Sequence, residues 1–220
     1  DYTSKIVNTG IQAGGIETAV PEIIRKDDLE TVLMFTENKE DIINNYTLVG
    51  TELTEYEQKI VNKYIGKDET VEAESAYILK DINKEEKEKL AVRLATPLLE
   101  ASTISNEETA NQIKSQMTAN MPEQQKAYIQ DKSIKEILSM MPDEQKNILL
   151  EQFTSKISEM SDSIKSQAAV SSVKQIYKNV GVDTDKIQNS YIIMAGFQML
   201  GVALVSMISA IIIMLLSARV

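Results

Sequence analysis

The feature that most constrains this sequence is the uncharged run Tyr191–Ala218 near its C-terminal end. The run has 28 residues, more than the roughly 20 that a helix needs to cross the hydrocarbon core of a bilayer. A signal peptide is excluded by the position and length of the run. A buried helix of a soluble protein is the alternative, and so long an uncharged run argues against it. We therefore predict a membrane-spanning helix.

One face of this predicted helix carries small residues, which recur at spacings of 7, 3, 4 and 7 and so fall on one side. Small side chains let a neighbouring helix approach closely, and membrane helices associate in this way. We expect this face to pack against other transmembrane helices of the same polypeptide, with the lipid bilayer around them; chance clustering is the alternative. The predicted packing face consists of Gly196, Ala203, Ser206, Ala210 and Ser217, and the opposite, greasy face of Met194, Phe197, Val205, Ile208, Ile212 and Leu215.

Gln198 is the strongly polar side chain of the run, and it lies nearer the greasy face than the small one. A lone amide in lipid is unfavourable. Either protein or a water-filled transport pathway meets Gln198, or its side chain reaches up to the membrane interface. The residue types leave both alternatives open.

The orientation follows from the few flanking charges. Arg219 is the charge after the run, whereas Asp183, Asp185 and Lys186 precede it. The positive-inside rule then places Val220 in the cytoplasm and residues 1–190 outside the plasma membrane. The sequence begins without Met or a signal sequence, and no basic cluster follows the run. We expect a segment of a longer polypeptide.

The composition excludes several classes of chemistry. The sequence has no Cys and no His, which excludes disulfides, thiolate or imidazole metal sites and Ser-His-Asp triads. Gly10, Gly14 and Gly15 are not followed by the GK[ST] of a nucleotide loop. The net charge of −10 repels nucleic acid, so we expect no nucleic-acid partner.

Acidic clusters have simpler explanations than catalysis or metal binding. Asp27-Asp28 and Glu107-Glu108 suit helix caps, and no partner nucleophile accompanies them. Asp183-Thr184-Asp185 begins like a calcium loop but lacks the glycine and the distal glutamate in register. We predict no catalytic residue, no cofactor and no metal in this segment, which is not itself an enzyme.

The part before the membrane helix has the composition of an all-α domain. Gly (8) and Pro (4) are scarce, and good helix formers abound. The stretches Tyr46–Val49 and Ala76–Leu79 suit either short strands or helical turns, and the polar stretch Asn111–Asn120 suits a linker. Helix starts are expected from capping patterns at Asp27/Glu30, Asn83/Glu86 and Ser105/Glu108 and from prolines at Pro21, Pro122 and Pro142. Gly181 is expected to end a helix, and Asp183 or Thr184 to cap the membrane helix.

Two longer periodic segments leave alternatives open. Leu90, Leu94 and Leu98 form a stripe that Pro97 interrupts, so the helix either kinks there or restarts at Thr96. Residues 143–180 carry two apolar stripes on opposite sides. They predict either a break near residues 166–169 or one helix of about 38 residues between two partners. The stripes are Phe153, Ile157, Met160 and Ile164, then Val170, Val173, Tyr177 and Val180.

The two ends of the sequence resemble a known family. The run Ser4-Lys5-Ile6-Val7-Asn8-Thr9-Gly10-Ile11 is similar to the outer end of the first transmembrane helix in bacterial ABC multidrug exporter half-transporters, where an I-V-[DN]-x-G-I pattern is frequent. The run Tyr191–Val220 resembles their second transmembrane helix. Its end, Ser217-Ala218-Arg219-Val220, looks like the entry to the cytoplasmic extension of that helix.

The resemblance implies a domain organisation. Residues 1–11 are the outer end of one membrane helix, residues 12–185 a helical extracellular insertion, and residues 186–220 the next membrane helix with the start of its cytoplasmic extension. The family's short loop at this place is replaced by roughly 175 residues, which we expect to form a cap that gates or assists substrate release. A second half-transporter is the implied partner, and ATP hydrolysis belongs to a domain outside this segment. The rival hypothesis is a single-pass surface-anchored ectodomain, such as an adhesin or a sensor.

Overall fold

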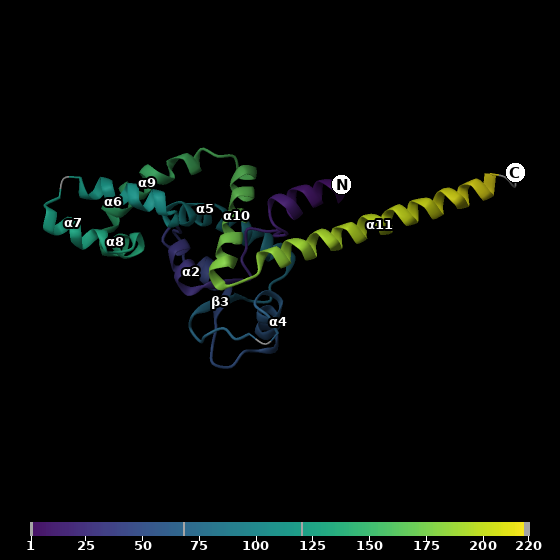
Figure 1. Ribbon diagram of the computed structural model, residues 1–220, viewed down its shortest axis with the longest axis horizontal. Helices are drawn as coiled ribbons and strands as arrows, with labels where there is room; N and C mark the ends of the chain where they lie inside the picture. Colours follow the sequence, from purple (N-terminus) through teal and green to yellow (C-terminus); the bar gives the residue numbers. More distant parts are fainter. Residues whose placement is uncertain (1, 68, 120, 218–220) are drawn as a thin grey trace. The chain divides into compact units, whose positions relative to one another are not determined.

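The chain is mostly helical, as predicted. The computed structural model describes residues 2–67, 69–119 and 121–217, with 68% helix and 5% strand (Figure 1). The prediction of an all-α chain needs one correction, because three short strands form an antiparallel sheet in the order β1-β3-β2. Arg219, on which the predicted orientation rests, lies outside the described residues.

Contacts divide the chain into two compact units. The smaller unit combines the chain up to Glu17 with the chain from Asp183 onward, and the larger unit is Thr18–Val182. The smaller unit contains helix α1 (Tyr2–Lys5), the π-helical segment η1 (Ile6–Gln12) and helix α11 (Thr184–Ser217). All other elements belong to the larger unit.

The sheet lies in the larger unit, and β3 (Ala76–Leu79) is its central strand. β1 (Ile23–Arg25) pairs with β3 through Ile23 and Ile78, and β2 (Tyr46–Leu48) pairs with it through Tyr46 and Leu79. The alternatives for Tyr46–Val49 and Ala76–Leu79 thus resolve as strands. The predicted helix start at Pro21 is wrong, because β1 begins two residues later. Ile23 and Ile24 are both fully buried, and an extended segment buried on both faces suits a strand.

Helices pack around the sheet and supply the main core. They are α2 (Lys26–Leu33), α3 (Glu40–Ile43), α4 (Glu55–Tyr64), α5 (Lys84–Ser105) and α10 (Asp162–Val180). α5 and α10 lie side by side (Figure 1), and the predicted stripe Leu90, Leu94 and Leu98 is buried. Pro97 lies inside α5, which continues without a restart at Thr96.

The end of α5 and four further helices form a lobe with its own hydrophobic cluster. The helices are α6 (Glu107–Thr118), α7 (Glu123–Gln130), α8 (Ile134–Met140) and α9 (Asp143–Ser158). The expected linker Asn111–Asn120 is wrong, because α6 covers most of it and Ile113 is fully buried. The buried members of the cluster are Ile104, Ile113, Ile134, Ile137, Leu138 and Leu150.

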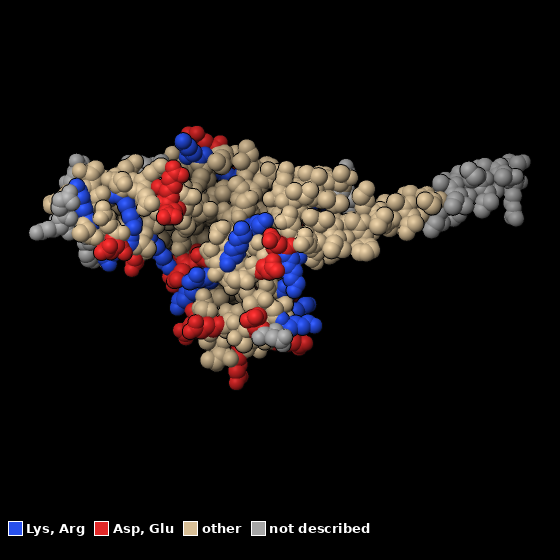
Figure 2. All heavy atoms as spheres, in the orientation of Figure 1, with Lys and Arg blue, Asp and Glu red and all other residues tan. Residues whose placement is uncertain are grey.

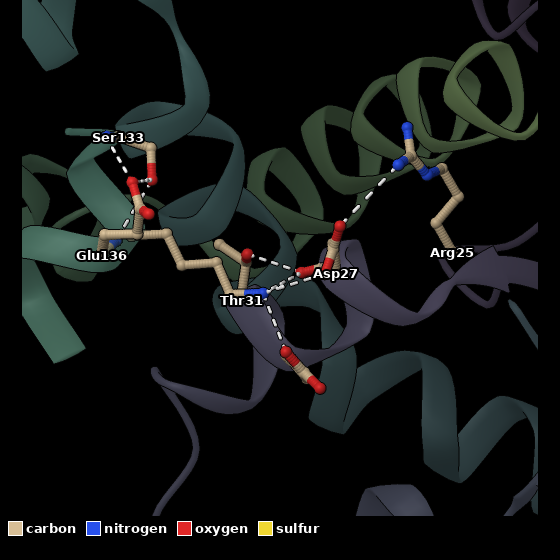
Figure 3. Close-up of polar contacts among 7 residues, drawn as sticks. Arg25, Asp27, Thr31, Ser133 and Glu136 are labelled. Atoms are coloured by element: carbon tan, nitrogen blue, oxygen red, sulfur yellow. Dashed lines mark hydrogen bonds and ion pairs between the residues drawn. The ribbon is translucent and has the colours of Figure 1, made fainter. Parts of the chain in front are cut away.

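Charged contacts join this lobe to α2. Lys135 of α8 pairs with Glu30 at 2.8 Å and with Asp27 at 3.5 Å. Figure 3 shows Asp27 between Arg25 and Thr31, with Ser133 and Glu136 on the facing helix. Ser133 and Glu136 form a capping box that starts α8. The lobe is therefore positioned both by its apolar cluster and by a polar contact with α2.

The helix caps agree with the sequence at some positions and differ at others. Asn83 and Glu86 form the predicted capping box, Gly181 ends α10 at a φ of 91°, and Asp183 accepts two backbone hydrogen bonds at the start of α11. Prolines 122 and 142 directly precede α7 and α9, as expected. Two predictions are wrong. Arg25 precedes α2 without a side-chain cap, and the cap of α6 is Asn106 rather than Ser105.

The break between the last two helices of the larger unit lies earlier than predicted. α9 ends at Ser158 and α10 begins at Asp162, whereas residues 166–169 lie within α10. Val173 and Tyr177 are buried, but Ile164 is 54% exposed. The upstream apolar stripe therefore contributes Ile157 to the core and leaves Ile164 at the surface.

A polar cluster around Glu22 connects three helices to the start of β1. We call it the Glu22 cluster; it consists of Glu22, Lys63, Tyr64, Lys87 and Tyr177. The Glu22 carboxylate accepts hydrogen bonds from Lys63 (2.7 Å), Lys87 (2.5 Å) and the Tyr64 hydroxyl (2.9 Å). The Glu22 backbone N–H donates to the Tyr177 hydroxyl at 3.0 Å, and the rings of Tyr64 and Tyr177 lie 4.8 Å apart.

The two lysines keep the Glu22 carboxyl ionised. Burial alone would raise its pKa, but the hydrogen bonds and charges of Lys63 and Lys87 outweigh burial and lower the pKa to about 2. A carboxyl whose folded pKa is lowered stabilises the fold above its ordinary pKa, and this contribution disappears as the pH falls through the folded pKa.

The Glu22→Gln variant is expected to unfold more easily. A neutral amide cannot neutralise two lysines, so we expect the free energy of unfolding to fall by about 2 kcal/mol. Urea denaturation at neutral pH, followed by circular dichroism, measures it. Glu85→Gln is the matched control, because Glu85 pairs with Lys89 on an exposed helix face and should change stability by less than about 0.5 kcal/mol. The difference in the free energy of unfolding between wild type and Glu22→Gln should shrink below pH 4.5 and vanish near pH 2. An equal loss in both variants would contradict the role of the cluster.

Candidate functional site

In the smaller unit, the N-terminal segment packs against the start of α11. The backbone of Gly10 lies beside Tyr191 and Ile192, and that of Gly15 lies beside Ile187 and Gln188. The order of contacts along one segment is reversed along the other. The two segments therefore form an antiparallel pair, which we call the helix pair.

Two glycines permit this close approach. A Cβ added at Gly15 would lie 2.9 Å from the Ile187 carbonyl oxygen and 3.0 Å from the Cβ of Tyr191. Gly15 also has a φ of +80°, which favours glycine. At Gly10 an added Cβ would lie 3.0 Å from Cγ1 of Ile192. The small residues that allow this close approach, Gly10 and Gly15, thus lie in the N-terminal segment and not in α11.

The N-terminal segment has π-helical geometry over Ile6–Gln12. At its end, the Ala13 N–H donates to the Asn8 carbonyl at 3.0 Å and the Gly15 N–H to the Thr9 carbonyl at 2.8 Å. π-helical segments are rare in proteins, and those that occur often lie at functional sites. Here the segment delivers Gly10 and Gly15 to the surface of α11.

The exposed surface of α11 is strongly apolar. Among the described residues, one helix is long and apolar enough to cross a membrane: the 24-residue stretch Thr184–Met207, with a mean hydropathy of 1.7. Phe197 is 70% exposed and Val205 is 64% exposed, and the part of α11 drawn in tan in Figure 2 carries no charged side chain on the visible face beyond its first turns. A continuous apolar surface of this kind needs lipid or protein around it.

The predicted packing face of α11 is not covered by the helix pair. The carbonyl oxygen of Val202 accepts a hydrogen bond from Ser206 at 2.9 Å, and Ala203, Ser206 and Gln198 are exposed. A Cβ added at Gly196 would meet nothing within 4 Å. The side chains of Ala210 and Ser217 lie outside the described residues. The packing face and the pathway role of Gln198 therefore stay predictions.

Sequence reasoning missed the contact that the structure shows. The sequence excludes a nucleotide loop at Gly10 and Gly15 but does not predict that they lie against α11. Two glycines five residues apart, beside an apolar segment, are a signal for close helix packing. The pairing also depends on the residues of α11 that contact these glycines. The whole larger unit separates those residues from the glycines in the sequence.

Comparisons with protein-family models, curated proteins and solved structures gave no significant match to this chain. The helix pair and the two terminal runs are the features of the chain that bear on its function.

The Gly15→Ala variant is expected to loosen the helix pair. The new Cβ would collide with backbone and adopt an unfavourable φ, which costs about 1–3 kcal/mol. The chain has no Cys, so cysteines placed at Ile11 and Gln188, whose side-chain amide reaches the Ile11 carbonyl at 3.5 Å, report the pairing through a short bis-maleimide crosslinker. We expect Gly15→Ala to reduce the crosslinking yield severalfold and the control Gly196→Ala to leave it unchanged. Equal yields in both would refute the close approach at Gly15.

Proposed function

We propose that this chain is part of an ATP-driven membrane exporter of the multidrug half-transporter type. Residues 1–11 are then the outer end of the first membrane helix and α11 is the second. The larger unit is a helical cap outside the membrane that gates or assists substrate release. Neighbouring membrane helices and a second half-transporter are its partners.

The observation that carries this proposal is the antiparallel helix pair. The run Ile6–Ile11, which resembles the outer end of the first exporter helix, lies against the first turns of the apolar helix that resembles the second. Successive membrane helices joined on one side of a bilayer run antiparallel, so the pairing supports the exporter assignment. An ectodomain with a single anchor has no need of a second helical segment against its anchor.

The charge distribution supports an extracytoplasmic cap. Acidic and basic side chains are intermixed over the larger unit (Figure 2), with acidic residues in excess. A mixed, net negative surface favours solubility. We infer that the larger unit is solvated outside the membrane, the sidedness that the positive-inside rule gives.

Crosslinking from α11 tests the exporter assignment in the intact polypeptide. A single cysteine at Ser206 lies on the predicted packing face, and one at Val205 lies at the same depth on the greasy face. We expect the Ser206→Cys variant to crosslink within a membrane bundle at several times the yield of the Val205→Cys variant, because small faces approach neighbouring helices. Equal low yields at both positions would favour an anchored surface ectodomain. A stop codon soon after Val220, together with an upstream signal peptide, would point the same way.

Deletion of the larger unit tests the cap. In the intact polypeptide, Glu17 is joined to Asp183 by a short Gly-Ser linker, so that the helix pair is kept. We expect export of a dye substrate to fall severalfold while ATP hydrolysis continues, because the deletion leaves the membrane helices and the nucleotide-binding domain in place. A point variant of an exposed residue, Val92→Ser, is the control. Unchanged export after the deletion would refute a gating role.

A further inference from the structure

A cavity of about 460 Å³ lies within the larger unit, between α2, α5 and α10, beside the start of α6. Its buried lining, which we call the floor, consists of the apolar residues Val32, Leu98, Ala101 and Ile176 together with Thr31 and Ser172. The size suits a small organic molecule, since ligand sites commonly have volumes of about 300–1,000 Å³.

The charges in the cavity are of one sign. Its ionisable lining residues among those described are Asp28 and Glu107, and no lysine or arginine lines it. The described residues contain no group of three or more His, Cys, Asp or Glu side chains that could hold a metal ion. The cavity therefore suits an organic cation better than an anion or a metal ion.

Asp28 differs from its acidic neighbours on α2. Asp27 and Glu30 both pair with Lys135, whereas no ion pair is formed with Asp28 among the described residues. The Asp28 carboxylate accepts a hydrogen bond from the Asn179 amide at 3.2 Å. Burial raises the pKa of Asp28 despite this bond and the charges of Arg25 and Lys135, and the neighbouring Asp27 carboxylate adds to the rise. The Asp28 charge is thus partly desolvated, and a bound cation would stabilise it.

Neutral polar groups surround this carboxylate. The Gln175 amide donates to the Asn179 oxygen at 3.1 Å, so an ordered amide chain leads to Asp28. Exposed Ser102, Ser105 and Asn106 lie on the side of the cavity formed by α5 and the start of α6. Hydroxyl and amide groups hydrogen-bond both donors and acceptors, which suits a ligand that carries several hydroxyls.

We propose that this cavity binds a small hydroxylated primary amine of the amino-sugar kind, with its ammonium group at Asp28. The apolar residues of the floor contact the carbon skeleton, and the amide and hydroxyl groups of the lining bind the ligand's hydroxyls. The proposal concerns the larger unit alone and does not rest on the exporter assignment.

Ligand-observed NMR titration of the full chain in detergent tests the proposal. The probes are glucosamine, which is a cation, and N-acetylglucosamine, its neutral analogue. We expect glucosamine to bind wild type at least tenfold more tightly than N-acetylglucosamine, because a charge-assisted hydrogen bond is lost in the analogue. This comparison needs no variant. Equal binding of the two sugars, or binding of neither, would overturn the proposal.

Variants at neighbouring carboxylates locate the site. Asp28→Asn should weaken glucosamine binding at least tenfold, and Asp28→Glu should retain part of it. Asp27→Asn is the matched control, since Asp27 neighbours Asp28 in sequence but pairs with Lys135, and it should change the affinity less than twofold. Circular dichroism confirms the fold of each variant. An equal loss in Asp27→Asn and Asp28→Asn would overturn the assignment to this cavity.

Discussion

The larger unit depends on a carboxylate at the point where its sheet begins. Glu22 precedes β1 and binds groups from α4, α5 and α10. Beside it, the Tyr46 hydroxyl donates to the Pro21 carbonyl at 3.0 Å and so adds a contact from β2. A sheet of three strands, each of three or four residues, has little stability of its own. Convergence of these polar groups on residues 21–22 fixes where the helices meet the sheet, and the buried isoleucines next to them supply the apolar contact.

Within the larger unit, the core around the sheet and the lobe of α6 to α9 depend to different extents on apolar packing and on polar contacts. Around the sheet, large side chains such as Leu94 and Leu98 are fully buried, and the polar groups among them are satisfied. The lobe formed by α6 to α9 has a smaller apolar cluster and relies on the contact of Lys135 with α2. A lobe with fewer buried contacts opens at lower free energy than the core beside it. The cavity at Asp28 lies where α2 and α10 of the core meet the first turn of the lobe, so local opening of the lobe would change its walls.

The sequence predicted the elements with strong local signals and missed those that depend on distant partners. The Leu90 stripe, the Asn83 cap and the Gly181 terminus follow from spacing and backbone chemistry, and all three are confirmed. β1 has only three residues, too few for periodicity to reveal, and it becomes a strand because β3 lies beside it. Asn106 caps α6 in place of Ser105 because α5 continues one residue further than the capping pattern indicated. Neither the helix pair nor the cavity could be predicted, since each joins residues more than 140 positions apart.

The helix pair has a consequence for the chain between its members. While the segments before Glu17 and after Asp183 stay together, they close Thr18–Val182 into a loop. A closed loop has fewer unfolded conformations, and a permanent crosslink around a loop of this size would stabilise the folded state by about 5 kcal/mol. The pair thus acts as a noncovalent counterpart of a disulfide in a chain without cysteine. We expect any environment that keeps the pair together to raise the thermal stability of Thr18–Val182.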